Sequence, residues 1–246
     1  MVLEYAQHGN LRNFLKKRIS INWVEKVYIL SDIAENLFHI HELNYIHRDL
    51  HSANILKLLK EALVSKITDL GLSQSFDNLN SSGSSNVCGV IPYVAPEVLN
   101  GKPYTFASDI YSFGIIMTEV STGKPPYATI PHDGNLALAI CNGLRPRVAK
   151  GTPKRYIDLV NQCLDANPEN RPSAKNLCDI IKDLYEHINS IDEYKVINFR
   201  KLPETTLHPQ AIYISRNFSF SNLSEPKNSM GVQIEDLEGN NYNDFY

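Results

Sequence analysis

Acidic and amide side chains gather with a histidine and an arginine in one short stretch of the 246-residue chain. His47-Arg48-Asp49 is followed by Asn54, five residues after the aspartate, and by Asp69-Leu70-Gly71, twenty residues after it. Asp and Asn offer the oxygen donors that a hard cation such as Mg²⁺ prefers. Each residue alone could equally be a surface aspartate or a turn asparagine. Their order, between an expected helix and an expected loop, is the layout of a site.

Three further features follow this stretch. Ala95-Pro96-Glu97 comes first, Asp109 lies in an apolar segment, and Arg171 stands in an Asn-Arg-Pro triplet. With them the chain resembles the protein kinase superfamily, whose signature runs H-R-D-L-x-x-x-N, D-F-G and A-P-E. The resemblance extends from Leu3 to about His187.

Residues 47–54 (HRDLHSAN) and 89–97 (GVIPYVAPE) look most like the tyrosine-kinase-like group, whose members mostly phosphorylate Ser and Thr. The resemblance therefore implies transfer of the γ-phosphate of ATP to Ser or Thr hydroxyls of protein substrates. It makes Asp49 the catalytic base, with Asn54 beside it in the catalytic loop. Asn54 and Asp69 become ligands of Mg²⁺, and they flank an expected hairpin whose two ends can meet at one metal.

Five residues around these three resemble the structural and regulatory residues of the family. His47 looks like the core histidine that supports the loop, and Asp109 like the aspartate that hydrogen-bonds the loop backbone. Glu97 and Arg171 look like a buried ion pair. Arg48 resembles the arginine that pairs with a phosphorylated activation loop, which implies an upstream kinase as a partner. The candidate phosphosites are Ser73, Ser75, Ser81, Ser82, Ser84 and Ser85.

At the front of the chain, Leu3 stands where the family has its gatekeeper, and Glu4, Tyr5 and Ala6 stand at the adenine-binding hinge. Leu56 resembles the apolar residue beneath the adenine ring, although a strand residue in a core is equally compatible. The small lobe that would precede this hinge, with its Gly-rich loop and lysine, is missing from the sequence. We therefore expect a large-lobe fragment that transfers phosphate very slowly or not at all alone.

Three positions depart from the family pattern. Leu70 replaces the usual Phe, and we expect it still to pack on His47. His51 stands where Ser/Thr kinases usually carry a lysine, and Val90 stands where many have threonine. The last two weaken the expectation of activity.

Composition excludes some classes of protein. A formal net charge of −3 gives no basic excess, so nucleic acid is not an expected partner. The four widely spaced cysteines indicate reduced thiols. We expect no membrane insertion, because no apolar run approaches the roughly 20 residues that cross a bilayer, and a cytoplasmic location inside the cell.

Apolar periodicity predicts the elements that position these residues. Helices are expected at 11–17, 22–43, 108–122, 135–142, 153–165 and 173–187, a strand at 1–5, and a hairpin from runs 55–59 and 62–67. The fold class is mainly α: a kinase C-terminal lobe, which is a helical bundle with short β-hairpins, followed by a disordered tail. The divisions are a hinge remnant at 1–10, the large lobe at 11–190, and a mostly disordered tail at 191–246.

Two alternatives stay open beside the enzyme. The chain could be a non-catalytic kinase-like scaffold that binds kinases or their substrates. The tail could instead be a tether that partners bind through segments such as Ala211–Ile214.

Overall fold

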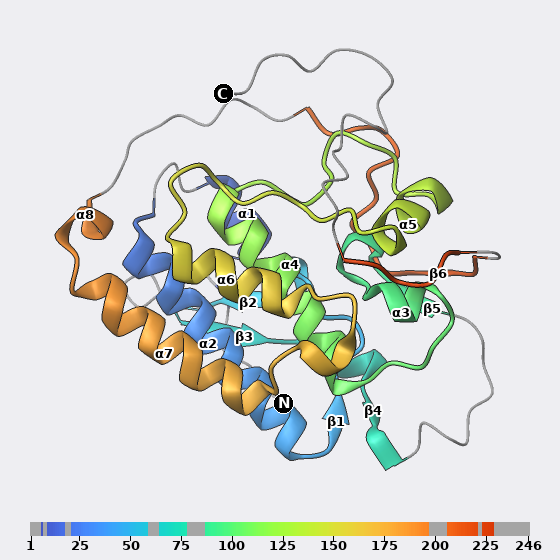
Figure 1. Ribbon diagram of the computed structural model, residues 1–246, viewed down its shortest axis with the longest axis horizontal. Coiled ribbons are helices and arrows are strands. Elements are labelled where there is room, and N and C mark those ends of the chain that lie inside the picture. Colours follow the sequence, from blue (N-terminus) through green and yellow to red (C-terminus); the bar gives the residue numbers. More distant parts are fainter. Residues whose placement is uncertain are drawn as a thin grey trace.

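The computed structural model describes residues 6, 9–17, 21–58, 64–77, 87–196, 206–220 and 223–228, which are mainly helical (Figure 1). The α-helices are α1 (Leu11–Lys17), α2 (Trp23–Glu42), α3 (Pro96–Leu99), α4 (Phe106–Thr122), α5 (Gly134–Cys141), α6 (Lys154–Cys163), α7 (Ala174–Asn189) and α8 (Asp192–Lys195). The strands are β1 (Tyr45–Ile46), β2 (Ile55–Lys57), β3 (Ser65–Ile67), β4 (Gln74–Ser75), β5 (Val87–Gly89) and β6 (Arg216–Phe218). The predicted mainly helical fold class is confirmed.

The long helix α2 begins at its predicted cap. The Asn22 side chain accepts a hydrogen bond from Glu25 N at 2.8 Å, and the Glu25 carboxylate accepts one from Asn22 N at 2.9 Å. This reciprocal pair satisfies two backbone donors that a helix start leaves open. The buried stripe of α2 packs along α7, so the two helices lie side by side (Figure 1). The stripe includes Val27, Leu30, Ala34 and Leu37.

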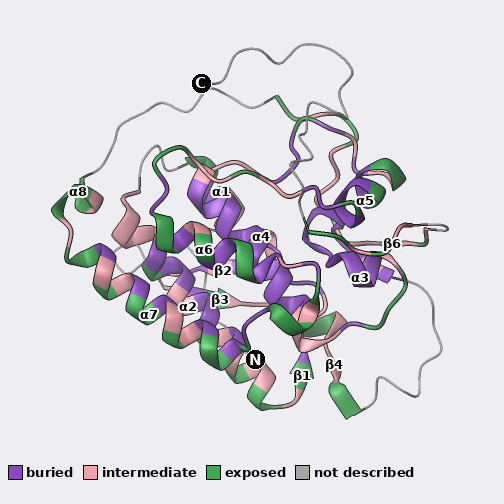
Figure 2. Ribbon diagram, viewed as in Figure 1, coloured by how far each residue is buried: buried purple, intermediate pink, exposed green. Residues whose placement is uncertain are grey.

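The central helix α4 is buried on nearly every side, as its apolar sequence predicts (Figure 2). It starts two residues before the predicted Ser108, because Thr105 is its cap and forms a reciprocal pair with Ser108. It ends at Gly123, whose φ of 70° closes the helix in the left-handed region that glycine adopts without a steric penalty.

The strands form three antiparallel pairs in the described part of the chain. β2 pairs with β3, with Ile55 opposite Ile67, which is the predicted hairpin. β1 pairs with β4. β5 pairs with β6, although 126 residues lie between Gly89 and Arg216 at their near ends. That last pair joins the helical body, which we define as the described residues between 9 and 196, to the tail beyond it.

Beyond residue 196, two pieces of the tail are described, and both lie against the helical body (Figure 1). We define the tail segment as residues 206–220; the second piece is 223–228. His208 N donates to Ala128 O and Lys227 N donates to Cys141 O, both at 2.9 Å. The sequence led us to expect disorder there, because scattered apolar residues give no periodic signal when their partners lie on another part of the chain.

The strand expected at 1–5 lies outside the described residues, and so do Leu3, Glu4 and the candidate phosphosites Ser81, Ser82, Ser84 and Ser85. All four cysteines are described as free thiols: Cys141 and Cys163 are buried, and Cys88 and Cys178 are half-buried. Within the described ranges, no helix combines the length and the apolar character that a membrane span requires.

Candidate active site

Asp49 lies in the loop that joins β1 to β2. The fully buried side chains of Ile46 and Leu50 hold this loop against the helical body. Asp49 is 6% exposed, and its Oδ2 accepts a hydrogen bond from Ser215 Oγ at 2.5 Å. Asn54 Nδ2 donates to the Asp49 backbone oxygen at 2.9 Å and lies 3.4 Å from Oδ2. The structure therefore brings Asp49 and Asn54 together, with a serine hydroxyl on the carboxylate.

His51 completes this group. Its Nε2 lies 3.3 Å from Ser215 Oγ and 3.6 Å from Asp49 Oδ2. Its Nδ1 accepts a hydrogen bond from Ala53 N at 3.2 Å. Because Nδ1 acts as an acceptor, the neutral imidazole carries its proton on Nε2, which faces Ser215 and Asp49.

Opposing effects set the pKa of Asp49. Burial is the largest single effect and raises the pKa. The hydrogen bond and charge of His51, the hydrogen bond from Ser215 and the charge of His47 together outweigh burial, so the pKa of Asp49 lies below its usual value. The carboxylate is therefore ionised at neutral pH, which is the state that a proton acceptor needs.

Asp109 fixes the backbone before Asp49. Its Oδ2 accepts from His47 N at 2.8 Å and its Oδ1 accepts from Arg48 N at 3.0 Å. Arg48 has a φ of 71°, a left-handed conformation that costs a non-glycine residue about 1–3 kcal/mol. The two charge-assisted hydrogen bonds offset that cost. His47 Nδ1 accepts from Asp49 N at 3.3 Å and its Nε2 lies 3.1 Å from Thr68 O, so the imidazole bridges two parts of the site.

The β2–β3 hairpin brings Asn54 and Asp69 to the same end. Thr68 N donates to Asn54 O at 2.8 Å, immediately before Asp69. Asp69 is exposed, has a φ of 61°, and accepts a hydrogen bond from Gly71 N. Within the described ranges no group of three or more His, Cys, Asp or Glu side chains could hold a metal. One amide and one carboxylate still fit Mg²⁺, which keeps several waters and shares phosphate oxygens.

Two of the expected adenine-binding residues, Ala6 and Leu56, lie among the described residues. Gly9 N donates to Ala6 O at 3.0 Å, and Lys57 N donates to Gly9 O at 2.9 Å. Asn10 forms an isolated bridge with Leu56, which is half-buried. Ala6 and Leu56 thus lie on neighbouring stretches of backbone.

Arg48 points toward the segment that follows the hairpin. Its Nη1 donates to Gln74 Oε1 at 2.6 Å, and its guanidinium lies 5.0 Å from the centre of the Tyr104 ring. Its Nε is buried and has no hydrogen-bond partner among the described residues. Ser73 and Ser75, which are candidate phosphosites, flank Gln74 in the sequence.

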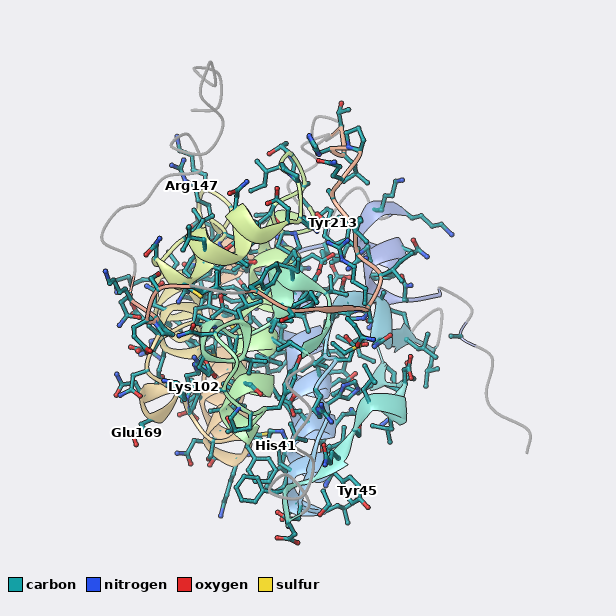
Figure 3. The ribbon with its side chains drawn as sticks, turned by 90° about the vertical axis from the view of Figure 1, so that its right-hand side faces the viewer. His41, Tyr45, Lys102, Arg147, Glu169 and Tyr213 are labelled. Atoms are coloured by element: carbon teal, nitrogen blue, oxygen red, sulfur yellow. The ribbon has the colours of Figure 1, made fainter. Side chains whose placement is uncertain are left out.

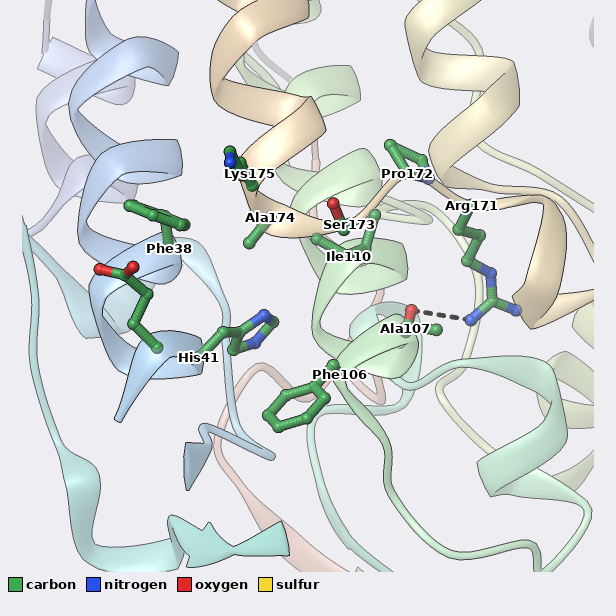
Figure 4. A pocket seen from close by; sticks show the side chains of 11 residues that line it. Phe38, His41, Phe106, Ala107, Ile110, Arg171, Pro172, Ser173, Ala174 and Lys175 are labelled. Atoms are coloured by element: carbon green, nitrogen blue, oxygen red, sulfur yellow. Dashed lines mark hydrogen bonds between the residues drawn. The ribbon is translucent and has the colours of Figure 1, made fainter. Parts of the chain in front are cut away.

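Arg171 and Glu97 form a bidentate pair. Nη1 and Nη2 donate to the two carboxylate oxygens at 2.7 and 2.8 Å, and both residues are buried. Arg171 also donates to Ala107 O at 2.9 Å, beside a pocket between the end of α2 and the starts of α4 and α7 (Figure 4). The pair thus ties α3 to the segment before α7.

Comparison with known proteins decides the family. The family model described as protein tyrosine and serine/threonine kinase matches residues 1–181. The chain belongs to the protein kinase family.

Several curated kinases resemble this one. It is 33% identical over 188 residues to a probable LIM domain-containing serine/threonine-protein kinase of Dictyostelium discoideum, covering 76% of this chain and 28% of that protein. It is 33% identical to the probable serine/threonine-protein kinase drkB of the same organism (74% and 26% covered). A serine/threonine-protein kinase of Arabidopsis thaliana is 26% identical (79% and 34% covered). The chain thus spans about a third or less of each of these three relatives.

One expectation about the kinase motif is wrong. Leu70 was expected to pack on His47, but its side chain is 57% exposed. The short 3-10 helix Leu70–Leu72 follows the left-handed Asp69 and carries the Leu70 side chain outward.

Three residues of the kinase site escaped sequence reasoning. His41 Nε2 lies 2.9 Å from Asp109 Oδ2, and His51 contacts Asp49, although the sequence singled out His51 merely as a departure. Ser215 lies 166 residues after Asp49 in a segment without periodicity. Proximity to Asp49 in sequence was a usable signal for His51, whereas no sequence signal pointed to Ser215.

Proposed function

We propose that the chain, joined to a kinase small lobe, transfers the γ-phosphate of ATP to Ser and Thr hydroxyls of protein substrates, and that alone it does so very slowly or not at all. One observation carries the proposal: the hydroxyl of a serine donates to Asp49 Oδ2 at 2.5 Å. Asp49 thus holds an acceptor-type group where a base must hold one. The choice of acceptor is supported by relatives that are named as serine/threonine-protein kinases.

Each candidate site residue has its own role in the transfer. Asp49 orients the acceptor hydroxyl and takes its proton as the oxygen attacks the γ-phosphorus, and the bond to the bridging oxygen of ADP breaks. Asn54 and Asp69 would hold Mg²⁺, which neutralises charge on the phosphates when bound. Leu3, Glu4, Ala6 and Leu56 would contact adenine.

Regulation and location complete the proposal. Arg48, with its buried Nε, would receive a phosphate placed on the neighbouring serine-containing loop by an upstream kinase. Membership of the tyrosine-kinase-like group fits the motifs at 47–54 and 89–97. An intracellular, cytoplasmic location fits the free thiols, because reducing compartments keep cysteines unpaired.

The test uses the chain alone and the chain fused behind the small lobe of a Ser/Thr kinase relative. Each form is incubated with Mg-ATP and a serine peptide, and phosphate transfer is measured. We expect transfer by the fusion and its loss in Asp49→Asn, while Asp158→Asn, at an exposed position on α6, keeps it. A folded fusion that transfers no phosphate would favour the non-catalytic scaffold instead.

A further inference from the structure

The tail segment crosses the helical body as a bound peptide would. His132 is its main backbone contact: His132 N donates to Gln210 O at 3.0 Å, and His132 Nδ1 lies 2.9 Å from Ile212 O. His208 N donates to Ala128 O at 2.9 Å. These contacts use main-chain atoms of the tail segment, which is the usual way in which a groove holds an extended chain.

Tyr213 anchors the segment (Figure 3). Its ring meets the His132 ring edge-on with centroids 4.7 Å apart, and the Arg12 guanidinium lies 4.5 Å from its centre. Its hydroxyl donates to Pro126 O at 2.8 Å. The next residue, Ile214, is 76% exposed. This alternation turns Ser215 inward, as in any extended chain with period two.

The contacts of Tyr213 place Ser215 against Asp49. His51 Nε2 carries a proton and lies 3.3 Å from Ser215 Oγ, so His51 donates to the serine oxygen. The serine hydrogen is then directed to Asp49 Oδ2, 2.5 Å away. The hydroxyl proton already faces the group that would remove it.

After Ser215 the segment continues as a strand on the body. β6 pairs antiparallel with β5, with Cys88 opposite Asn217 and Gly89 opposite Arg216. Arg216 also donates to the backbone oxygen of His132. Addition of a strand to an exposed edge fixes the register of a bound peptide. The register here places one serine, rather than its neighbours, on Asp49.

We propose that the tail segment binds in the acceptor-peptide groove of its own chain and that Ser215 is a site of intramolecular phosphorylation. This inference rests on the proposed function and names one of its substrates. Ser215 Oγ forms a bond to the γ-phosphorus of ATP, the bond from that phosphorus to the bridging oxygen breaks, ADP leaves, and the hydroxyl proton passes to Asp49. Because donor and acceptor belong to one molecule, the rate is independent of protein concentration.

The position of the tail segment is tested first, in an experiment that does not depend on phosphate transfer. Asn217→Cys in the full chain is treated with a short bis-maleimide, and the cross-linked residues are mapped by mass spectrometry. We expect a link to Cys88, which is opposite residue 217 in the register. Ile214→Cys, at an exposed position of the same segment, is the matched control and should give little of this link. Equal yields from the two variants would overturn the placement.

The phosphorylation of Ser215 is tested with the full chain fused behind the small lobe of a Ser/Thr kinase relative, given Mg-ATP and a serine peptide at several concentrations of the fusion. We expect phosphate on Ser215, at a fractional rate independent of concentration. It should be lost in Ser215→Ala and kept in Ser215→Thr and Ser219→Ala, since Ser219 is an exposed neighbour. Phosphate on the peptide without phosphate on Ser215 would overturn the assignment of Ser215 as an acceptor and leave the proposed function intact. No phosphate on either would overturn the proposed function, and the acceptor role with it.

Discussion

Arg171 places both terminal nitrogens of its guanidinium against the two carboxylate oxygens of Glu97, at 2.7 and 2.8 Å, with both side chains buried. Removing one partner leaves a buried charge without compensation. We expect Arg171→Met to lower the free energy of unfolding by about 3–5 kcal/mol. Urea unfolding followed by circular dichroism measures the loss.

The matched control is an exposed pair. Lys154 and Asp158 form an ion pair one turn apart on α6, and both are largely solvent-exposed. Lys154→Met should cost about 0–1 kcal/mol, because water screens the charges of an exposed pair. Losses of the same size in the two variants would contradict the structural role of the buried pair.

Asp109 supports the loop that carries Asp49. In Asp109→Asn, one of the two backbone amides at His47 and Arg48 meets an amide group instead of a carboxylate oxygen. An unsatisfied buried donor costs about 1–3 kcal/mol. We expect a loss of stability in that range and slower phosphate transfer by the fused kinase. Asp133→Asn, at the half-buried cap of α5, should be nearly neutral because Asn caps helices as well as Asp.

The pKa of Asp49 should depend on His51. His51 supplies the largest effects that lower this pKa against burial. A depressed carboxyl pKa adds stability above the unfolded-state value of about 3.9, and that stability is lost as pH falls through the folded-state pKa. His51→Gln should raise the Asp49 pKa, so that the loss begins at a higher pH. Carbon-13 NMR titration of the Asp49 carboxyl measures it, with the exposed His39→Gln as control. An unchanged pKa would exclude this role of His51.

Glu119 and Arg12 form an ion pair beneath the tail segment. Burial raises the pKa of Glu119 most strongly, and the charge of Arg12, 3.6 Å away, lowers it. Arg12→Met should raise that pKa further. A raised carboxyl pKa favours the folded state at acidic pH, and the benefit is lost as pH rises through the folded-state value. The variant should therefore lose more stability at neutral than at acidic pH.

Urea unfolding of Arg12→Met at neutral pH and at acidic pH checks this expectation. Lys102→Met removes one partner of an exposed pair with Glu225 and serves as control. A loss of stability in Arg12→Met that is the same at both pH values would show that lost contacts, rather than charge, explain it.

Local sequence signals predicted most of the fold. Asn22 and the apolar stripe after it placed α2, because a cap and a periodic face are encoded within one stretch of chain. The start of α4 was missed by two residues, since Thr105 caps the helix from outside the apolar run. The β5–β6 pair could not be predicted, because strand pairing across so many residues leaves no mark in either segment.

In the candidate site, too, the parts set by nearby residues could be predicted from the sequence and the parts set by tertiary contacts could not. Asp49 and Asn54 lie five residues apart, so a motif relates them, and the structure joins them by a hydrogen bond. Leu70 shows the limit of a motif: its position was given, but not the direction of its side chain. Ser215 belongs to the site through the anchoring of Tyr213 and β6, and such tertiary contacts are invisible in sequence.

Loosening the tail segment should open the acceptor groove. A segment bound in the same molecule competes with an external peptide, so it divides the apparent affinity for that peptide by the reciprocal of the unoccupied fraction, which raises the apparent KM and leaves kcat unchanged. Tyr213→Ala removes the ring contacts with His132 and Arg12, which are worth roughly 0.5–1.5 kcal/mol. We expect the KM of the fused kinase for a serine peptide to fall by about two- to tenfold. Ile214→Ala, at the exposed neighbouring position, should leave KM unchanged, and a fall in kcat with constant KM in Tyr213→Ala would mean that Tyr213 supports catalysis instead.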